Sequence, residues 1–145
     1  MHETDQRRAS ARGSREFVKM NILYITNHLN AGGITSYVLT LAAGLKKKGH
    51  RIYLASSGGE LLADFIKEGI EYIRIPIRTK SEISPKILLS ALKLKNLLKR
   101  DKIDIIHAHS RTTQVAGCLL ASLGGVPYIS TCHGFFKKRF SRQAF

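Results

Sequence analysis

Short apolar segments alternate with amphipathic helical segments from residue 21 to residue 132, and this alternation restricts the fold more than any other feature. Runs of apolar and β-branched residues predict five buried strands, at 21–26, 51–56, 71–75, 103–107 and 128–132. Helical periodicity predicts helices between them, over 35–48, 60–67, 85–100 and 113–123. Strands that alternate with helices form a parallel sheet covered on both faces. We therefore expect a doubly wound, Rossmann-like α/β domain.

The expected topology also locates the ligand site. Right-handed crossovers favour the strand order 3-2-1-4-5, with a switch point between the first and fourth strands. Ligands bind at the carboxyl ends of the strands at such a point. In this sequence those ends are the loop 27–33, residues 109–112, and the turn after the fifth strand. One crevice is thus expected to bring together a Gly-Gly pair and three histidines, His28, His109 and His133.

The length and charge of the chain set limits on its organisation and partners. It has 145 residues, the size of one domain, and 24 basic against 10 acidic residues give a net charge of +14. Residues 1–19 contribute +2 and residues 137–145 contribute +4, so the excess is spread along the chain. A phosphorylated substrate and an anionic membrane fit such a field. Nucleic acid is disfavoured, because the cations are dispersed and no binding motif surrounds them.

The first 19 residues lack periodicity and predict a disordered basic tail ahead of a domain over 20–145. They have no apolar core of the kind found in a secretory signal. No apolar run approaches the roughly 18 residues that a bilayer-spanning helix needs. Cys118 and Cys132 have no metal-type spacing and suit a reducing compartment. These observations predict a cytoplasmic protein.

Gly32 and Gly33 stand between the first strand and the first helix. Without side chains there, backbone N–H groups and the positive helix end can approach a phosphate. The alternative is a tight turn that needs positive φ. A nicotinamide or flavin dinucleotide is disfavoured, because the Gly-x-Gly-x-x-Gly pattern is absent and Ser56-Ser57-Gly58 stands where a ribose-binding acid is expected.

His107 and His109 are two residues apart on a predicted strand, so they point to the same face if the strand extends that far. His107 is expected to be structural, and His109, at the strand end, to face a ligand. Zinc ligation by His109, Cys132 and His133 is an alternative, since these residue types bind zinc. Adjacent strand residues point to opposite faces and no carboxylate supports the set, so a histidine that binds phosphate or hydroxyl is preferred.

The helix predicted over 85–100 has a narrow apolar stripe of Ile87, Ala91, Leu94 and Leu98, suited to packing on the sheet. Four further leucines lie off this stripe, at positions 88, 89, 92 and 97. They are interleaved with cations, of which Lys93, Lys95, Lys99 and Arg100 are expected to face an anionic membrane. The alternatives are docking to a partner domain and a helix that is broadly buried.

Three segments together resemble the family-4 retaining glycosyltransferases, which have two Rossmann-like domains in the GT-B arrangement. The first runs from Asn21 through Ala-Gly-Gly-Ile-Thr-Ser-Tyr to Lys-Lys-Gly-His-Arg-Ile. The second is Asp-Ile-Ile-His-Ala-His-Ser at 104–110, and the third is Pro-Tyr-Ile-Ser-Thr-Cys-His-Gly at 127–134. The resemblance covers residues from Met20 onward.

The resemblance implies roles for individual residues. Gly32 and Gly33 would lie near the donor phosphates, and His133 would be the catalytic-site histidine that contacts the donor sugar. Lys137 or Lys138 would hold a phosphate-bearing or lipid-linked acceptor. The remaining acceptor or cleft-lining positions would be Asn30, His109, Ser110 and Gly134. No metal or other cofactor is implied, because cations and helix ends stabilise the departing diphosphate in this fold.

The resemblance further implies that the chain is the acceptor-binding, amino-terminal domain of such an enzyme, with the donor-binding domain absent. We expect it to act with a nucleotide sugar and a glycan or lipid-linked cell-envelope acceptor, at the cytoplasmic face of the membrane, and to be inactive by itself. A separate chain could supply the donor domain. The alternative is a non-catalytic module that binds a membrane or a partner.

Overall fold

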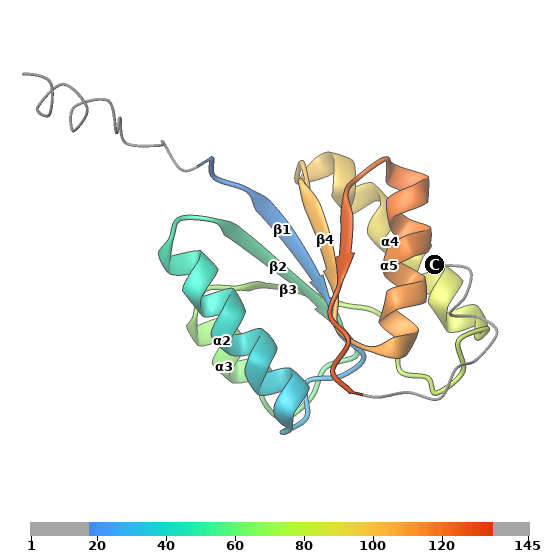
Figure 1. Ribbon diagram of the computed structural model, residues 1–145, viewed down its shortest axis with the longest axis horizontal. Coiled ribbons are helices and arrows are strands. Elements are labelled where there is room, and N and C mark those ends of the chain that lie inside the picture. The colour runs from blue at the N-terminus through green and yellow to red at the C-terminus, as the bar shows by residue number, and fades with distance from the viewer. Residues whose placement is uncertain (1–17, 135–145) are drawn as a thin grey trace, which may run out of the picture.

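The computed structural model describes residues 18–134, which form one parallel sheet with helices on both faces (Figure 1). The strands are β1 Asn21–Ile25, β2 Arg51–Ser56, β3 Glu71–Arg74, β4 Ile105–Ala108 and β5 Tyr128–Ser130. The helices are α2 Gly33–Lys47, α3 Leu62–Lys67, α4 Pro85–Arg100 and α5 Arg111–Gly124. The strand order is β3-β2-β1-β4-β5, which confirms the predicted order and the Rossmann-like fold class. All but two residues of the predicted 1–19 tail lie outside the described residues.

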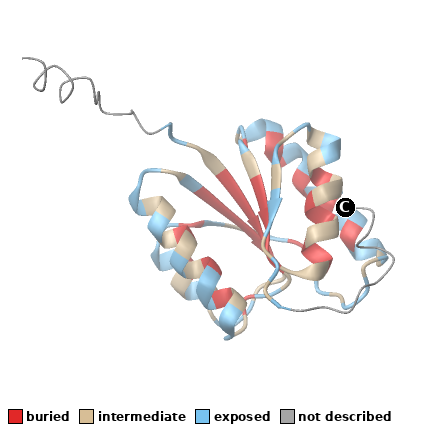
Figure 2. Cartoon of the chain, viewed as in Figure 1, coloured by how far each residue is buried: buried red, intermediate tan, exposed pale blue. Residues whose placement is uncertain are grey.

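The sheet separates two apolar cores, because alternate side chains of each strand point to opposite faces. Leu23 and Ile25 of β1 face the core under α4 and α5, whereas Ile22 and Tyr24 face the core under α2 and α3. β2 repeats the alternation, with Tyr53 on the first face and Ile52 on the second. Buried positions accordingly lie along the central strands and the inward sides of the helices (Figure 2).

The helix ends follow local sequence signals. The Ser84 hydroxyl accepts a hydrogen bond from the Lys86 N–H at the start of α4, and Pro85 occupies the first turn, where its missing N–H has no cost. At the end of α5, Gly125 adopts the left-handed conformation with a φ of 65°. α4 matches its predicted bounds, whereas α5 begins two residues earlier than expected.

The strand ends place the functional positions. β4 begins at Ile105 instead of residue 103 and continues to Ala108, and β5 ends at Ser130. In the parallel register Ala108 is opposite both Ile25 and Ser130. The residues that follow β1, β4 and β5 therefore emerge at one edge of the sheet.

The buried side of α4 is wider than the sequence predicts. Leu97, which was expected to lie off the packing stripe, is only 6% exposed and belongs to the core with Leu94 and Leu98. The buried side of α4 is broader than a single stripe because α4 packs against α5 as well as against the sheet. Within the described residues, no helix has the length and apolar character required to cross a bilayer.

Candidate functional site

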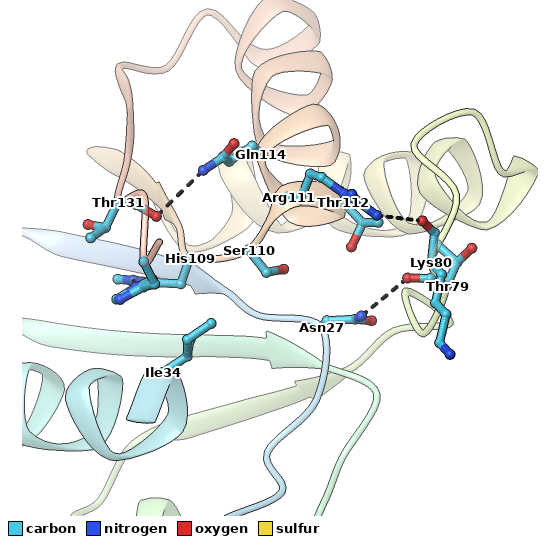
Figure 3. A pocket seen from close by; sticks show the side chains of 11 residues that line it. Asn27, Ile34, Thr79, Lys80, His109, Ser110, Arg111, Thr112, Gln114 and Thr131 are labelled. Atoms are coloured by element: carbon cyan, nitrogen blue, oxygen red, sulfur yellow. Dashed lines mark hydrogen bonds between the residues drawn. The ribbon is translucent and has the colours of Figure 1, made fainter. Parts of the chain in front are cut away.

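A cleft of about 340 Å³ opens at the carboxyl ends of β1, β4 and β5 (Figure 3). We call it the candidate cleft. It is lined by the loop after β1, the first turns of α2 and α5, the loop before α4, and the segment after β5. Its lining residues are Asn27, Ile34, Thr79, Lys80, His109, Ser110, Arg111, Thr112, Gln114, Thr131 and His133. The cleft lies at the switch point between β1 and β4, where a doubly wound sheet binds its ligands.

Three histidine rings gather beside this cleft, and they belong to His107, His109 and His133. His28 was expected in the crevice, but it is exposed and is not among the described lining residues of the cleft. The centroids of the His107 and His109 rings lie 3.9 Å apart, which confirms that the two side chains share one face of the strand. Nδ1 of His109 lies 3.3 Å from Nε2 of His133. His107 Nε2 is 2.8 Å from the Thr131 hydroxyl, so His107 has the structural partner expected of it.

Two tyrosines enclose the histidines. The Tyr24 ring stacks on His109 at 5.2 Å, and the Tyr37 ring meets His133 edge-on at 5.0 Å. Tyr24 is buried, and burial raises the pKa of its hydroxyl above the ordinary range. The rings leave His133 partly exposed at the cleft while they hold it in place.

The buried histidines are neutral at physiological pH. Burial lowers the pKa of His107 to about 4, with a further contribution from His133. Burial lowers the pKa of His109 to about 3, with contributions from His107 and His133. A neutral imidazole has one donor and one acceptor nitrogen, so each ring can donate one hydrogen bond and accept another from a neighbouring group.

Three buried polar atoms of cleft residues have no hydrogen-bond partner within residues 18–134. They are Oδ1 of Asn27, Nε2 of His109 and Oγ1 of Thr112. Buried polar groups in folded proteins are nearly always hydrogen-bonded, so unpaired ones call for a water or a ligand. The arrangement suits a ligand with several hydroxyl or phosphate oxygens.

The loop between β3 and α4 is tied to the cleft by Arg111, the first residue of α5. Its Nε lies 2.8 Å from a Glu82 carboxylate oxygen, and its Nη2 donates to the Lys80 carbonyl at 3.0 Å. On the other side of the loop, the Asn27 amide donates to the Thr79 carbonyl at 3.2 Å. These contacts hold Thr79 and Lys80 at the edge of the cleft (Figure 3).

The amino end of α2 reaches the same cleft through Ile34. Within the described residues no side chain caps this end, and the first turn contains no acidic residue. A Cβ added at Gly32 or Gly33 would meet no atom of residues 18–134 within 4 Å, and both glycines are exposed. The backbone of Gly32 is extended, and Gly33 does not have a positive φ. A tight turn with positive φ therefore does not explain why two glycines stand here. The geometry suits an anion at the helix end.

The other predicted site residues are placed as follows. His109, Ser110 and His133 line the cleft, whereas Asn30 and Gly134 are not among its described lining residues. The Asn30 side chain lies against Gly59 instead. Lys137 and Lys138 lie outside the described residues. Cys132 is exposed, and residues 18–134 contain no group of three or more His, Cys, Asp or Glu that could hold a metal.

Some cleft residues were not named individually from the sequence. Asn27, Arg111 and Thr112 lie in the segments 27–33 and 109–112, which the sequence placed at the crevice. Thr131 was expected inside the strand over 128–132, but β5 ends at Ser130, so Thr131 follows the strand and reaches the cleft. Lys80 gave no comparable signal, because the contacts of its loop with Arg111 bring it to the cleft.

Fold and site together define a Rossmann-like domain with a cleft at the switch point of its sheet, lined mainly by residues with polar side chains. The sequence model of Glycosyltransferase Family 4 matches residues 31–145, and the chain belongs to that family. This result confirms the resemblance found in the sequence.

Curated and solved relatives agree with this assignment. The chain is 35% identical over 84 residues to the UDP-Gal:alpha-D-GlcNAc-diphosphoundecaprenol alpha-1,3-galactosyltransferase of Escherichia coli, a match that covers 57% of this chain and 22% of that protein. It is 27% identical to the D-inositol 3-phosphate glycosyltransferase of an Arthrobacter strain, over 74% of this chain and 28% of the relative. The crystal structure of a glycosyltransferase from Rickettsia africae superposes with a TM-score of 0.73 at 25% identity, over 88% of this chain and 33% of that one. The chain thus spans less than a third of the length of either curated relative.

Proposed function

We propose that this chain is the acceptor-side domain of a glycosyltransferase that moves a sugar from a nucleotide-diphosphate sugar to a lipid-linked or other cell-envelope glycan acceptor. The main support is the candidate cleft, where His109, Thr112 and Asn27 present unpaired polar atoms within or beside the segment that the family model matches. The E. coli relative is named for an acceptor with a sugar on a lipid diphosphate. A cleft with Lys80 at its edge suits such an acceptor.

The proposed roles follow from the positions of the groups. His133, held by His109 and Tyr37, would donate a hydrogen bond to a hydroxyl of the donor sugar. The open N–H groups at Gly32 and Gly33 would stabilise the diphosphate as it departs, since a helix end favours negative charge. Fixed donors of this kind lower the barrier because they need no reorganisation during the reaction. The polar groups of His109, Ser110 and Thr112 would bind the acceptor.

Transfer would also need a donor-binding domain, by analogy with the two-domain enzymes that the chain resembles. Such a domain would bind most of the nucleotide sugar and close over the cleft. We propose that the chain alone binds acceptor without transferring sugar, and that no metal is needed. We also propose that the reaction takes place at the cytoplasmic face of the membrane, where a lipid-linked acceptor can reach the cleft. The competing function is a non-catalytic module that binds a membrane or a partner.

The test is a nuclear magnetic resonance titration of the full chain with N-acetylglucosamine diphosphate bearing a short lipid tail. We expect the amide signals of Ser110, Thr112 and Thr131 to shift. Thr112→Val removes a hydroxyl without changing the side-chain shape and should weaken binding about fivefold, the typical effect of one hydrogen bond. Cys132→Ala, an exposed position beside His133, is the matched control and should bind normally. Shifts confined to residues outside the cleft, or no binding at all, would contradict the proposal and favour the non-catalytic module.

A further inference from the structure

The outer side of α4 has an apolar strip that no other described element covers. Leu88, Leu89 and Leu92 are 49%, 55% and 48% exposed, although α4 is otherwise well packed. Leu88 and Leu92 are four residues apart and Leu89 and Leu92 are three apart, so the side chains are neighbours on the helix surface. Ile83, just ahead of the helix, is 90% exposed. We call these four residues the leucine strip.

Cations flank this strip on both sides, and the 16 residues of α4 include no Asp or Glu. On a helical wheel, Lys95 lies to one side of the leucines and Lys86 and Lys93 lie to the other. Lys99 continues the strip toward the end of the helix. Arg100 differs from the others, because its guanidinium is paired with the Asp101 carboxylate at 2.9 Å.

Two basic pockets that share Arg78 lie between the leucine strip and the candidate cleft, and we call them together the basic groove. Its first part, about 720 Å³, is lined by Leu89 and Lys93 of α4 together with Arg74 and Arg78. The Lys93 ammonium donates to the Arg74 carbonyl at 2.6 Å, which holds it over this part of the groove. The second part shares Arg78 and adds Lys80 and Lys86. Asn27, Thr79 and Lys80 line both this second part and the candidate cleft. Among residues 18–134, no acidic residue lines any of the three pockets.

We propose that the leucine strip and the basic groove dock this domain on an anionic lipid bilayer. The leucines would enter the boundary between headgroups and acyl chains, and the flanking lysines would contact lipid phosphates. A protein partner fits less well, because protein interfaces are depleted of lysine, whereas juxtamembrane lysines are attracted to anionic lipid. The lysines around the leucine strip therefore favour an anionic bilayer over a protein partner at this surface.

The docked orientation would connect the membrane to the cleft. With α4 on the bilayer, the groove through Arg78 and Lys80 runs from the headgroup level to the candidate cleft. A lipid-anchored diphosphate could follow this basic path to His109 and His133. This last step rests on the proposed glycosyltransferase function, whereas the docking itself does not.

The test is co-sedimentation of the full chain with vesicles of phosphatidylcholine alone or mixed with an equal part of phosphatidylglycerol. We expect binding to the anionic vesicles only. Lys95→Glu/Lys99→Glu should weaken binding roughly 30-fold or more, because each lysine near an anionic surface favours binding about fivefold and each glutamate opposes it. Leu88→Gln/Leu92→Gln should weaken binding at least tenfold.

Matched controls lie on the opposite face of the sheet. Lys47→Glu/Lys48→Glu at the end of α2 makes the same change in charge, and Ile66→Gln on α3 replaces an apolar residue that is 55% exposed. Both should bind nearly as well as the unaltered chain, with unchanged circular dichroism in every variant. If Lys47→Glu/Lys48→Glu weakened vesicle binding as much as Lys95→Glu/Lys99→Glu, binding would depend only on the net charge of the chain, and the proposal would be overturned. Unchanged binding by the leucine variant would also overturn it, as would a protein dimer that the leucine variant dissociates.

Discussion

Nδ1 of His109 lies 3.3 Å from Nε2 of His133, so a fully buried imidazole orients one that reaches the cleft surface. The Tyr24 ring stacks on His109 and fixes its orientation, and the Tyr37 ring packs edge-on against His133 and restricts its rotation. Because burial keeps His109 neutral, its contact with His133 is a directed hydrogen bond rather than a repulsion between two cations. His133 therefore occupies a preorganised position, as a group that must meet a developing charge requires.

Replacement of His133 tests its proposed catalytic role. In a complete enzyme, formed by joining the chain to a donor-binding domain, His133→Ala should lower kcat by at least roughly 100-fold, since it removes a preorganised donor. The measurement is transfer of a labelled sugar to the lipid-linked acceptor. Cys132→Ala should retain activity, and the circular dichroism of both variants should match the parent. Full transfer by His133→Ala would remove this residue from the site.

His109 should act as a positioning residue for His133. His109→Ala removes the supporting nitrogen and should lower kcat in the same joined enzyme about tenfold or more, with a smaller change in KM. His109→Asn places an amide near the position of Nδ1 and should recover much of the loss. The pH dependence of kcat should shift in His109→Ala, because the neighbour of His133 changes. Equal activity of the Asn and Ala variants would show that His109 has only a structural role.

The buried histidines make stability depend on pH. The pKa values of His107 and His109 in the folded chain, about 4 and about 3, lie below the ordinary value of 6.5. As the pH falls below 6.5 the unfolded chain takes up these protons first, so folding weakens, and the stability that is present above pH 6.5 is lost toward pH 3. Between pH 7 and pH 5 we expect each histidine to lower the free energy of unfolding by about 2 kcal/mol, which is about 4 kcal/mol for the two together.

Urea unfolding at pH 7, 6 and 5 measures this loss. His109→Gln should have a smaller slope of unfolding free energy against pH than the parent, because it removes one of the two groups. His28 is exposed, so His28→Gln is the matched control and should keep the parent slope. A parent whose stability does not change over this range would contradict the burial of the two imidazoles.

The sequence predicted the strand order and the shared face of His107 and His109, because alternation and crossover handedness act on a local pattern. It placed His109 and His133 in one cleft for the same reason, since both follow parallel strands. It failed for Leu97, because a helical wheel describes packing on one surface, whereas α4 packs on both the sheet and α5. The place of Lys80 at the cleft could not be predicted from the sequence either, because it depends on a hydrogen bond from Arg111, which lies 31 residues further along the chain.

Two helical glycines should respond in opposite ways to the same substitution. A Cβ at Gly117 of α5 would lie 2.7 Å from Tyr128 Cε2 and 3.3 Å from the Ala108 Cβ. The Tyr128 ring cannot move aside freely, since its hydroxyl donates to the Gln114 carbonyl at 3.0 Å. Gly117→Ala should therefore lower the free energy of unfolding by about 1–3 kcal/mol, the usual cost of overpacking.

Gly44 of α2 is the matched control, because a Cβ there would meet no atom of the described part of the chain within 4 Å. Gly44→Ala should raise the free energy of unfolding by about 0.5–1 kcal/mol, since alanine favours the helical backbone. Urea denaturation of both variants at pH 7 provides the comparison. If Gly117→Ala were stabilised as much as Gly44→Ala, α5 could not pack as closely on β5 as the structure shows. The position of Thr131 at the cleft would then also need revision, because the Gln114 amide that donates to the Thr131 carbonyl lies on α5.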